Sequence, residues 1–485
     1  MLFLVFLDPQ VPMALDLAQV LQIHLAGDLV LAEKAYRYLL QYPNPDTLVL
    51  VNLAAICSDS ARTEEASALL KRALLTDPDL PDAYYNLGNI LQNEKKHNEA
   101  VDFYHRAIKL NKTFSKAHYN LGNSLVSLGN IVEAISHYEE ALLYEPNHYN
   151  AHINLAMAML LSGQFERGWN EYEYRFLAEP NIISPPLNIE KWDEDFLFRG
   201  TLLLVYEQGL GDTIQFSRYL SNLKNKGMKV ALCLQKPLRR LFEETARKNV
   251  EVGACEQSLQ GLDPEILIYS AENYADLDLS NTRWFPLMSL PRLFKTDLLN
   301  IPSPTSLLVP SDHQKYWKAV LGTSPKFRIA LAWQGNPEHE KRNSKGRSFP
   351  LESLAVLAKL ADIEFISLQK LAGSEQLDNC SFRNKFIHSQ QEISQSMDFL
   401  DTAAIMQLCD LVITSDTSIA HLAGTLNIKT WVALKKTPEW RWLLETDKTP
   451  WYSSLTLFRQ SEDDNWDEVF MKMALELKNT LNVSV

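Results

Sequence analysis

A period of 34 residues in the first third of the chain constrains the fold more than any other feature of the sequence. The segments DAYYNLGNILQNEKKHNEAVDFYHRAIKLN (82–111) and KAHYNLGNSLVSLGNIVEAISHYEEALLYEP (116–146) align without a gap. Small residues, leucines and tyrosines recur at matched positions: Leu87 and Leu121, Gly88 and Gly122, Ala100 and Ala134, Tyr104 and Tyr138, Ala107 and Ala141. Small residues let two antiparallel helices approach closely, and the larger ones fill the layer between them. Because one pair cannot bury its own apolar face, the pattern predicts a stack of helix pairs.

The period resembles that of the tetratricopeptide repeat, and we expect about five copies over residues 13–180. A coiled coil or a chance coincidence explains agreement at so many positions less well. Residues 1–12 carry no basic residue, and their apolar run ends at Asp8, so they suit neither a membrane span nor a signal peptide. We expect a short N-terminal leader, a candidate mis-assigned start ahead of Met13. We also expect a cytoplasmic protein without a transmembrane segment.

Asparagine occupies one repeat position in four successive copies, as Asn52, Asn86, Asn120 and Asn154. Each side-chain amide offers both a donor and an acceptor. A column of such amides along the concave face of the stack could hold an extended peptide backbone, and we predict a peptide- or partner-binding site there. The alternative, that asparagine is simply common at this repeat position, is equally compatible with the sequence.

A Pro-rich linker at 181–200 separates the repeats from a region of short apolar runs. The runs lie at 201–206, 229–234, 265–269, 328–333, 363–368, 411–414, 430–434 and 455–458. Buried runs separated by helical stretches indicate parallel sheets with crossover helices. We predict an N-terminal Rossmann-like domain over 201–305 and a C-terminal one over 306–463. A helix within 464–485 is a candidate for crossing back to the first of them.

The charge of the chain excludes some classes of partner. A net charge of −13 argues against general binding of nucleic acid or of anionic membranes, since both need a positive surface. The five cysteines are widely spaced and form no CxxC pair, so we predict neither a disulfide framework nor a zinc site. HExxH and GxSxG motifs are absent, and we interpret the acidic stretches at 193–195 and 276–278 as linker and loop. No metal is predicted.

The stretch EQGLGD comes after the first apolar run and places Asp212 at the start of a helix. Gly209 and Gly211 permit a close backbone approach, but Ile214 stands where a dinucleotide-binding motif has its third glycine. A dinucleotide site is therefore poorly supported. A plain helix-capping role for Asp212 is as good an interpretation as a functional one.

Polar and charged residues also follow two of the apolar runs in the second predicted domain. The loop after 328–333 carries Lys341, Arg342, Lys345 and Arg347 among Gly, Asn and Ser, which suits a phosphate or diphosphate; the alternative is a solvated basic loop. In TSDTSIAHLAG (414–424), a helix that begins after Asp416 would present the free amides of Thr417 and Ser418 to an anion, with His421 one turn further on. The alternative makes Asp416 a cap and His421 a core residue.

These motifs together resemble bacterial tetratricopeptide proteins with a C-terminal glycosyltransferase domain. The segments EQGLGDTIQFSRYL, ALAWQGNPEHEKRNSKGRSFPL, FISLQK and DTAAIMQLCDLVITSDTSIAHLAGTLNIKTWVAL carry the resemblance, which covers nearly all of 13–485. The domain is similar to the ADP-heptose lipopolysaccharide heptosyltransferases of glycosyltransferase family nine. The resemblance implies a fold of the α + α/β class, a tetratricopeptide α-solenoid followed by a GT-B-type pair of Rossmann-like domains. It implies inverting, metal-independent transfer from a nucleotide-diphosphate sugar, which is a substrate; no cofactor is expected.

The resemblance also implies roles for particular residues. Asp212 matches the probable general base, and the donor-binding residues would be Gln208, Gly209, Gly211, Trp333, Gly335, Asn336, Arg342, Arg347, Gln369, Asp416, Thr417, Ser418 and His421. The heptosyltransferases lack the repeat array, so the acceptor is a glycan or a polypeptide. We interpret Trp440, Trp442 and Trp451 as core residues in preference to an acceptor-side wall. Two alternatives stay open. One is a protein O-glycosyltransferase, similar to protein O-N-acetylglucosamine transferase, acting on polypeptide held by the repeats; the other is a non-catalytic scaffold.

Overall fold

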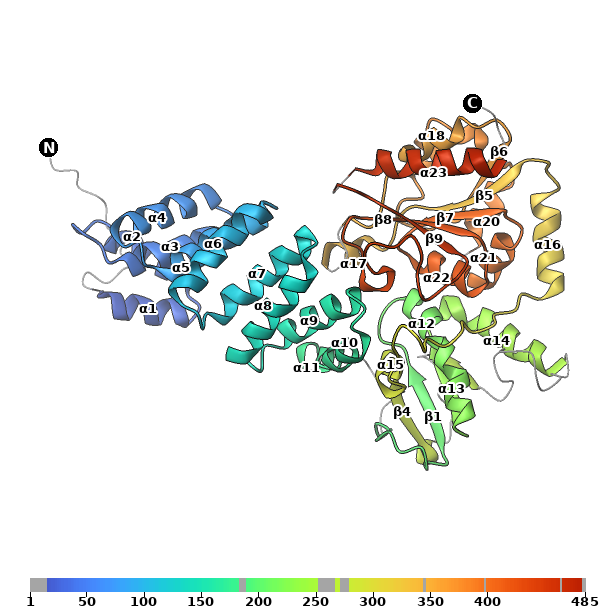
Figure 1. Ribbon diagram of the computed structural model, residues 1–485, viewed down its shortest axis with the longest axis horizontal. Helices are drawn as coiled ribbons and strands as arrows, with labels where there is room; N and C mark the ends of the chain where they lie inside the picture. Colours follow the sequence, from blue (N-terminus) through green and yellow to red (C-terminus); the bar gives the residue numbers. More distant parts are fainter. Residues whose placement is uncertain are drawn as a thin grey trace. The chain divides into compact units, whose positions relative to one another are not determined.

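The computed structural model describes residues 15–182, 189–251, 267–270, 279–342, 346–396, 398–462 and 465–481. The chain divides into two compact units, Met1–Ala158 and Met159–Val485 (Figure 1). The predicted leader, 1–12, lies outside the described residues.

The first unit is a stack of antiparallel helix pairs, as the 34-residue period predicts. Its helices are α1 (Leu17–Leu25), α2 (Leu29–Leu39), α3 (Thr47–Asp59), α4 (Thr63–Thr76), α5 (Pro81–Asn93), α6 (His97–Leu110), α7 (Ser115–Leu128), α8 (Ile131–Tyr144) and the first part of α9 (Tyr149–Leu161). The carboxylates of Asp16, Asp28 and Asp46 accept hydrogen bonds from free amides at the starts of the first three helices. Gly129 ends α7 with a φ of 86°, a backbone conformation that favours glycine.

The small residues of the repeat are required by the packing of each pair. A Cβ atom added to Gly88 would lie 2.6 Å from Cε1 of Tyr104, and one added to Gly122 would lie 2.6 Å from Cε1 of Tyr138. Both tyrosine rings are buried. The second helix of each pair therefore lays its tyrosine directly on the backbone of the first helix, and this close contact fixes the geometry that the stack repeats.

The asparagine column ties neighbouring repeats together. Nδ2 of Asn120 donates to Oη of Tyr85 at 3.2 Å and to Oδ1 of Asn89 at 2.8 Å. One repeat later, Nδ2 of Asn154 donates to Oη of Tyr119 at 3.1 Å and to Oδ1 of Asn123 at 2.8 Å.

In the first of these repeats the column makes a different contact, since Nδ2 of Asn52 donates to the carbonyl oxygen of Leu48 within its own helix. The side-chain amide donors of Asn120 and Asn154 thus serve the stack, whereas that of Asn52 bonds within its own helix. A peptide that bound at Asn120 or Asn154 would have to use the side-chain carbonyl oxygens.

We expect Asn120→Ala to loosen the stack between α5 and α7. The change removes two hydrogen bonds between repeats, each with a net value of about 1 kcal/mol. Amide hydrogen exchange should report faster opening of α5 to α8 than in the unchanged chain.

Asn86→Ala is the matched control for that change. It alters the same repeat position, but the preceding repeat offers Val51 and Ala55 where Tyr and Asn would accept. Equal effects of the two substitutions would show that the ties of Asn120 do not hold the stack.

The second unit contains two parallel sheets, as the alternating pattern predicts. The first has the order β3-β2-β1-β4 and the second β6-β5-β7-β8-β9, and every pairing in both is parallel. The strands are β1 (Thr201–Val205), β2 (Lys229–Leu234), β3 (Leu267–Ser270), β4 (Thr282–Pro286), β5 (Phe327–Ala332), β6 (Ile363–Ser367), β7 (Leu411–Ser415), β8 (Thr430–Leu434) and β9 (Leu455–Arg459). Strand β4, TRWFP, was not among the predicted strands, because it begins with polar residues and ends in proline.

Helices connect these strands and cover the sheets. They are α10 (Phe165–Tyr172), α11 (Arg175–Ala178), α12 (Leu210–Phe216), α13 (Leu220–Asn225), α14 (Lys236–Glu251), α15 (Leu290–Leu293), α16 (Ser311–Leu321), α17 (Pro337–Arg342), α18 (Ala355–Ala358), α19 (Gln376–Asn379), α20 (Gln390–Gln395), α21 (Phe399–Met406), α22 (Ser418–Thr425) and α23 (Trp466–Leu481). Within the described part of the chain, no helix combines the length and apolar character that a membrane crossing needs.

Helix α10 belongs to the second unit, although we placed it in the repeat region that ends at residue 180. Phe165 stacks on Trp451 with ring centroids 5.8 Å apart, and Trp169 meets Trp440 edge to face at 5.1 Å. These rings are almost completely buried, as is Trp442. The tryptophans of the C-terminal region are therefore core residues, and they bury the last helix that continues the repeat pattern.

The C-terminal helix α23 packs on the second sheet, not on the first as we considered. Its buried residues Val469, Phe470 and Met473 belong to one core with Phe349 and Ile329 of β5. Figure 1 shows α23 beside α18 along that sheet. Phe470 meets Phe349 at a centroid distance of 4.7 Å, and this apolar face explains why the helix stays with the second sheet.

Candidate functional site

Polar and charged side chains gather at the carboxyl ends of strands from both sheets. Asp212 lies on α12 after β1, Asp416 comes directly after β7, and Glu439 and Arg441 come after β8. Helix α12 packs on α22, so the two sheet edges meet at these helices. The carboxyl edge of a parallel sheet is where ligands of α/β proteins usually bind.

Both carboxylate oxygens of Asp212 are engaged. Oδ2 accepts the backbone N–H of Gly209 at 2.8 Å and so caps α12 from within its first turn. Oδ1 forms an ion pair with Arg441. The capping alternative from the sequence is thus part of what this residue does, and the Arg441 partner is an addition that the sequence did not indicate.

Arg441 is the centre of the charged cluster, and its guanidinium group is buried. It pairs with Asp212 and with Glu439, and its Nε donates to Oε1 of Gln215 at 2.5 Å. The guanidinium also lies 4.3 Å from the ring centroid of Trp440, within cation–π range. A buried cation needs such a complete set of partners, because desolvation is costly for a charge that is left unpaired.

Two acidic groups of the cluster hold their protons more tightly than usual. Burial raises the pKa of Glu439 to about 7, with a further contribution from the negative charge of Asp416, while Arg441 opposes the change. Burial also raises the pKa of Asp416, against the positive charge of Arg347 and the indole of Trp442. Carboxyl groups perturbed by burial and by specific charges are typical of functional sites, although structural ion pairs show them too.

The start of α22 presents backbone donors at this edge. The helix begins at Ser418, and Thr417 is its N-cap with no side-chain capping bond. The hydroxyl group of Thr417 instead contacts that of Thr414 on β7, at 3.1 Å. First-turn amides of a helix lack partners within the helix and favour an anion. The helix begins one residue later than the sequence suggested, and Asp416 precedes its cap.

His421, on α22, is buried, and its ring faces α12. Its Nδ1 contacts the hydroxyl group of Tyr452 at 3.2 Å, and its ring stacks on Trp442 at a centroid distance of 5.5 Å. A Cβ added to Gly211 would lie 2.7 Å from its Cδ2, so the ring rests against the backbone of α12. Burial lowers the pKa of His421 well below its usual value, and the neutral ring serves packing here. This placement agrees with the core alternative for His421.

Arg347, in the predicted basic loop, lies close enough to the carboxyl edge of the second sheet for its positive charge to act on Asp416. Its guanidinium lies over Gly335, where a Cβ would meet Nη2 at 2.5 Å, and its Nε pairs with Glu340 at 3.3 Å. Asn336 caps α17 by accepting the N–H of Glu338. Arg342 lies at the end of α17 with a side chain outside the described part of the structure, and Lys345 is also outside it.

Trp333 and Gln369 support the loop from within. The indole of Trp333 is fully buried and donates to the carbonyl oxygen of Gly373 at 3.1 Å. The Gln369 side chain accepts from the amides of Trp333 and Gln334 and donates to the carbonyl oxygens of Gln334 and Ala372. The polar atoms of both side chains thus bond to backbone groups.

On the first sheet's side, Gln208 is held by a helix from the repeat pattern. Its Nε2 donates to the hydroxyl group of Tyr172 on α10 at 2.9 Å. The side chain of the neighbouring Glu207 is fully buried and pairs with Arg175 at 2.7 Å. Glu439, Arg441 and this buried pair were not among the residues that we predicted for the site. A signal was present for the first two in the stretch TPEWRWLL, where charges alternate with tryptophans.

Comparisons with known proteins bear on the first unit. Residues 81–114 and 115–148 each match the model of the tetratricopeptide repeat, and residues 61–95 match a second TPR repeat model. These segments are tetratricopeptide repeats. Such repeats stack into extended surfaces that bind other proteins.

Similar proteins add little beyond that. Protein FlbA of Caulobacter vibrioides is 26% identical over 302 residues, which cover 60% of this chain and 48% of FlbA, so the chain spans about half the length of that relative. A crystal structure of MamA is 24% identical and covers 35% of this chain and 98% of MamA, with a TM-score of 0.30. YrrB, a TPR protein with an unusual peptide-binding site, is 19% identical and covers 34% of this chain and 84% of YrrB, with a TM-score of 0.29.

The pKa of Glu439 predicts how stability changes with pH. The folded pKa of about 7 lies above the ordinary 4.5, so the folded protein binds the proton more tightly than the unfolded chain. Between these pH values the free energy of unfolding should therefore fall as pH rises. In Glu439→Gln, urea unfolding at pH 5 and at pH 7 should show a smaller difference between the two conditions.

Glu392→Gln, at an exposed position on α20, serves as the control and should leave the pH profile of unfolding unchanged. An equally steep profile in Glu439→Gln and the unchanged chain would mean that Glu439 does not titrate in this range.

Proposed function

We propose that the chain is an inverting glycosyltransferase of GT-B type, similar to glycosyltransferase family nine, that moves a sugar from a nucleotide-diphosphate sugar to an acceptor hydroxyl. The observation that carries this proposal is the ion pair between Asp212, which follows a strand of the first sheet, and Arg441, which follows a strand of the second. A transferase of this type needs a base on one side of the site and cations for the diphosphate on the other.

The second sheet's edge offers suitable chemistry for the diphosphate. Arg347 and Arg441 supply guanidinium groups, which bind phosphate oxygens in a fork geometry. The first-turn amides of α22 supply further donors. The nucleotide sugar is a substrate in this proposal, and the charge stabilisation comes from the protein's own cations, with no metal or cofactor.

The ion pair between Arg441 and Asp212 suggests how binding and chemistry are linked. A diphosphate that draws the guanidinium toward itself would leave Oδ1 of Asp212 without its partner. That oxygen could then take the proton of the acceptor hydroxyl as the hydroxyl attacks the anomeric carbon, opposite the departing diphosphate. General-base catalysis of this kind requires a carboxylate within hydrogen-bond reach of the acceptor.

Binding of the donor can be tested by thermal unfolding in the presence of a panel of nucleotide sugars. A ligand that binds only the folded state at 100 times its Kd adds about 2.7 kcal/mol of stability. We expect at least one member to raise Tm, and Arg347→Gln to weaken its affinity by about tenfold or more.

Arg383→Gln, an exposed cation elsewhere in the second unit, is the control and should bind as the unchanged chain does. If no nucleotide sugar alters Tm, or if Arg347→Gln binds the donor normally, the proposed donor site is wrong.

Asp212→Asn separates chemistry from donor binding. The amide oxygen can still accept the N–H of Gly209, so α12 stays capped, but the basicity is lost. Loss of a general base typically lowers kcat by about 10²–10⁴. Donor affinity should be unchanged or tighter, since Arg441 no longer pairs with a carboxylate.

Asp378→Asn, at an exposed position on α19, should keep full activity. Transfer within a few-fold of the unchanged rate in Asp212→Asn would leave that residue a cap and an ion-pair partner only.

The structure also favours a second candidate, a non-catalytic scaffold. Both oxygens of Asp212 are engaged, and His421 is buried against Tyr452 and Trp442. Under this candidate the repeats bind a protein partner and the two sheets only support them. Absence of transfer across a broad panel of donors, glycans and peptides would support the scaffold, whereas transfer to peptides alone would support a protein O-glycosyltransferase. A cytoplasmic location remains our prediction in either case.

A further inference from the structure

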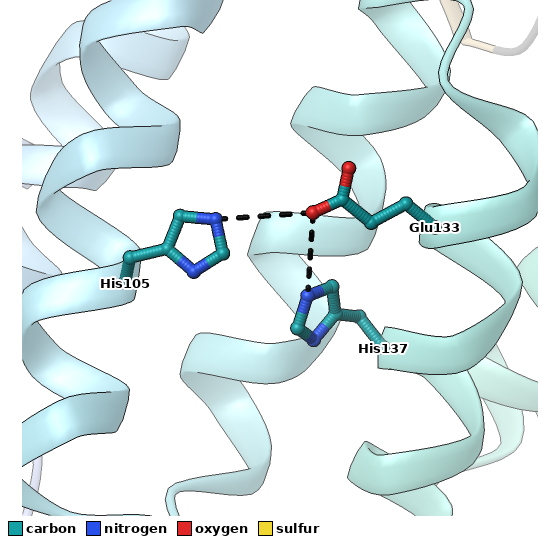
Figure 2. A group of neighbouring side chains, drawn as sticks. All are labelled: His105, Glu133 and His137. Carbon is teal, nitrogen blue, oxygen red and sulfur yellow. Dashed lines mark ion pairs between the residues drawn. The ribbon is translucent and has the colours of Figure 1, made fainter.

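A cluster of metal-ligating side chains joins two neighbouring tetratricopeptide repeats in the first unit, whereas the proposed transferase site belongs to the second. His105 lies on α6 of the repeat at 81–114, and Glu133 and His137 lie on α8 of the repeat at 115–148. Figure 2 shows the two imidazole rings and the carboxylate turned toward one another across the gap between the helices. Glu133 and His137 are four residues apart on one helix, a spacing that places them on the same face.

The ligand atoms of this cluster are close enough to share one ion. Nε2 of His105 and Nε2 of His137 each lie 4.0 Å from Oε1 of Glu133, and all three ligand atoms lie within 4.8 Å of one another. A zinc ion with bonds of about 2.0–2.2 Å in tetrahedral geometry needs ligand atoms about 3.3 Å apart. Each atom would therefore move inward by roughly half an ångström or more, which half-buried and exposed side chains can do by small rotations.

The protonation of His137 can be read from a chain of hydrogen bonds behind it. Nε2 of His118 lies 3.2 Å from the carbonyl oxygen of Lys112, and because a carbonyl oxygen only accepts, this nitrogen carries the proton. Nδ1 of His118 is then the acceptor for Nδ1 of His137, 3.1 Å away. The proton of a neutral His137 is thus on Nδ1, and its Nε2 presents a lone pair to Glu133.

The contact between His137 and Glu133 has no proton that the two side chains could share. A neutral His137 meets the carboxylate with two electron-rich atoms, Nε2 and Oε1, facing each other. A cation between the two atoms would satisfy both of them. Metal-binding histidines usually donate their second N–H to a neighbouring acceptor in the way that His137 does to His118.

We propose that His105, Glu133 and His137 form a binding site for a divalent transition metal of the Zn²⁺ class, with His118 as a positioning residue. Two imidazoles and one carboxylate are ligands that Zn²⁺ accepts, and they leave a fourth position open to water or to a group from a bound partner. HExxH and cysteine motifs, on which our prediction of no metal was based, do not reveal a ligand set that is divided between two repeats.

A metal ion at this position would link α6 to α8 across the junction between the repeats. Because the site exists only when the two repeats are stacked, binding would stabilise the stack and slow its local opening. The array would then be stiffer at this junction with metal than without it.

The test uses the full, tag-free chain and Zn²⁺ alone. Titration calorimetry at pH 7.5 should show one site per chain, and Co²⁺ in its place should give the visible absorption of a tetrahedral complex. His105→Ala and Glu133→Gln should each weaken the affinity by more than about tenfold, since even second-sphere partners are worth roughly 10–100-fold. His388→Ala, which removes an exposed imidazole from the other unit, is the control and should bind normally.

His118 is tested through the proton that it directs. In His118→Phe the ring of His137 is free to place its proton on Nε2, so Zn²⁺ affinity should fall and its dependence on pH should change, while α7 and α8 remain helical by circular dichroism. Absence of stoichiometric binding would overturn the proposal. So would binding that survives both His105→Ala and Glu133→Gln, which would indicate an adventitious ion only.

Discussion

The buried guanidinium of Arg441 is the interaction on which the arrangement of the second unit depends. It contacts Asp212 and Gln215 from the first sheet's side and Glu439 from its own. Loss of all these partners would leave a charge without compensation in a region of low polarity, which is strongly destabilising. These polar contacts thus join the two sheet edges, together with the packing of α12 on α22.

Strands buried on both faces were the part of the fold that the sequence predicted best. The runs at β2 and β8 were located with their observed bounds, because continuous apolar residues between polar ends admit few other interpretations. β4 escaped notice because a strand at the edge of its sheet can carry Thr, Arg and Pro. The suggestion that α23 crosses back to the first sheet was also wrong, because an amphipathic helix does not reveal which of two sheets its apolar face will cover.

The candidate site was predictable in outline and less so in its contacts. Polar residues after β1 and β7 do lie at one edge, as their positions after parallel strands indicate. The engagement of each side chain could not be foreseen, because it depends on residues far away in the sequence. Arg441 reaches Asp212 across 229 positions, and the tyrosine that holds His421 is 31 residues away. Sequence spacing identifies the residues at the end of a strand but not the partners of their hydrogen bonds.

The ties between repeats have a consequence for how such a chain can lengthen. Each of the repeats at 81–114 and 115–148 presents a tyrosine and an asparagine to the next repeat, and the second also supplies Asn120, which bonds to the pair before it. A duplicated unit of 34 residues would therefore arrive with both halves of the connection and join the array without any new mutation. An insertion of another length would put its asparagine out of phase with its acceptors. At these junctions the hydrogen bonds are therefore kept only when the added length is a multiple of 34 residues.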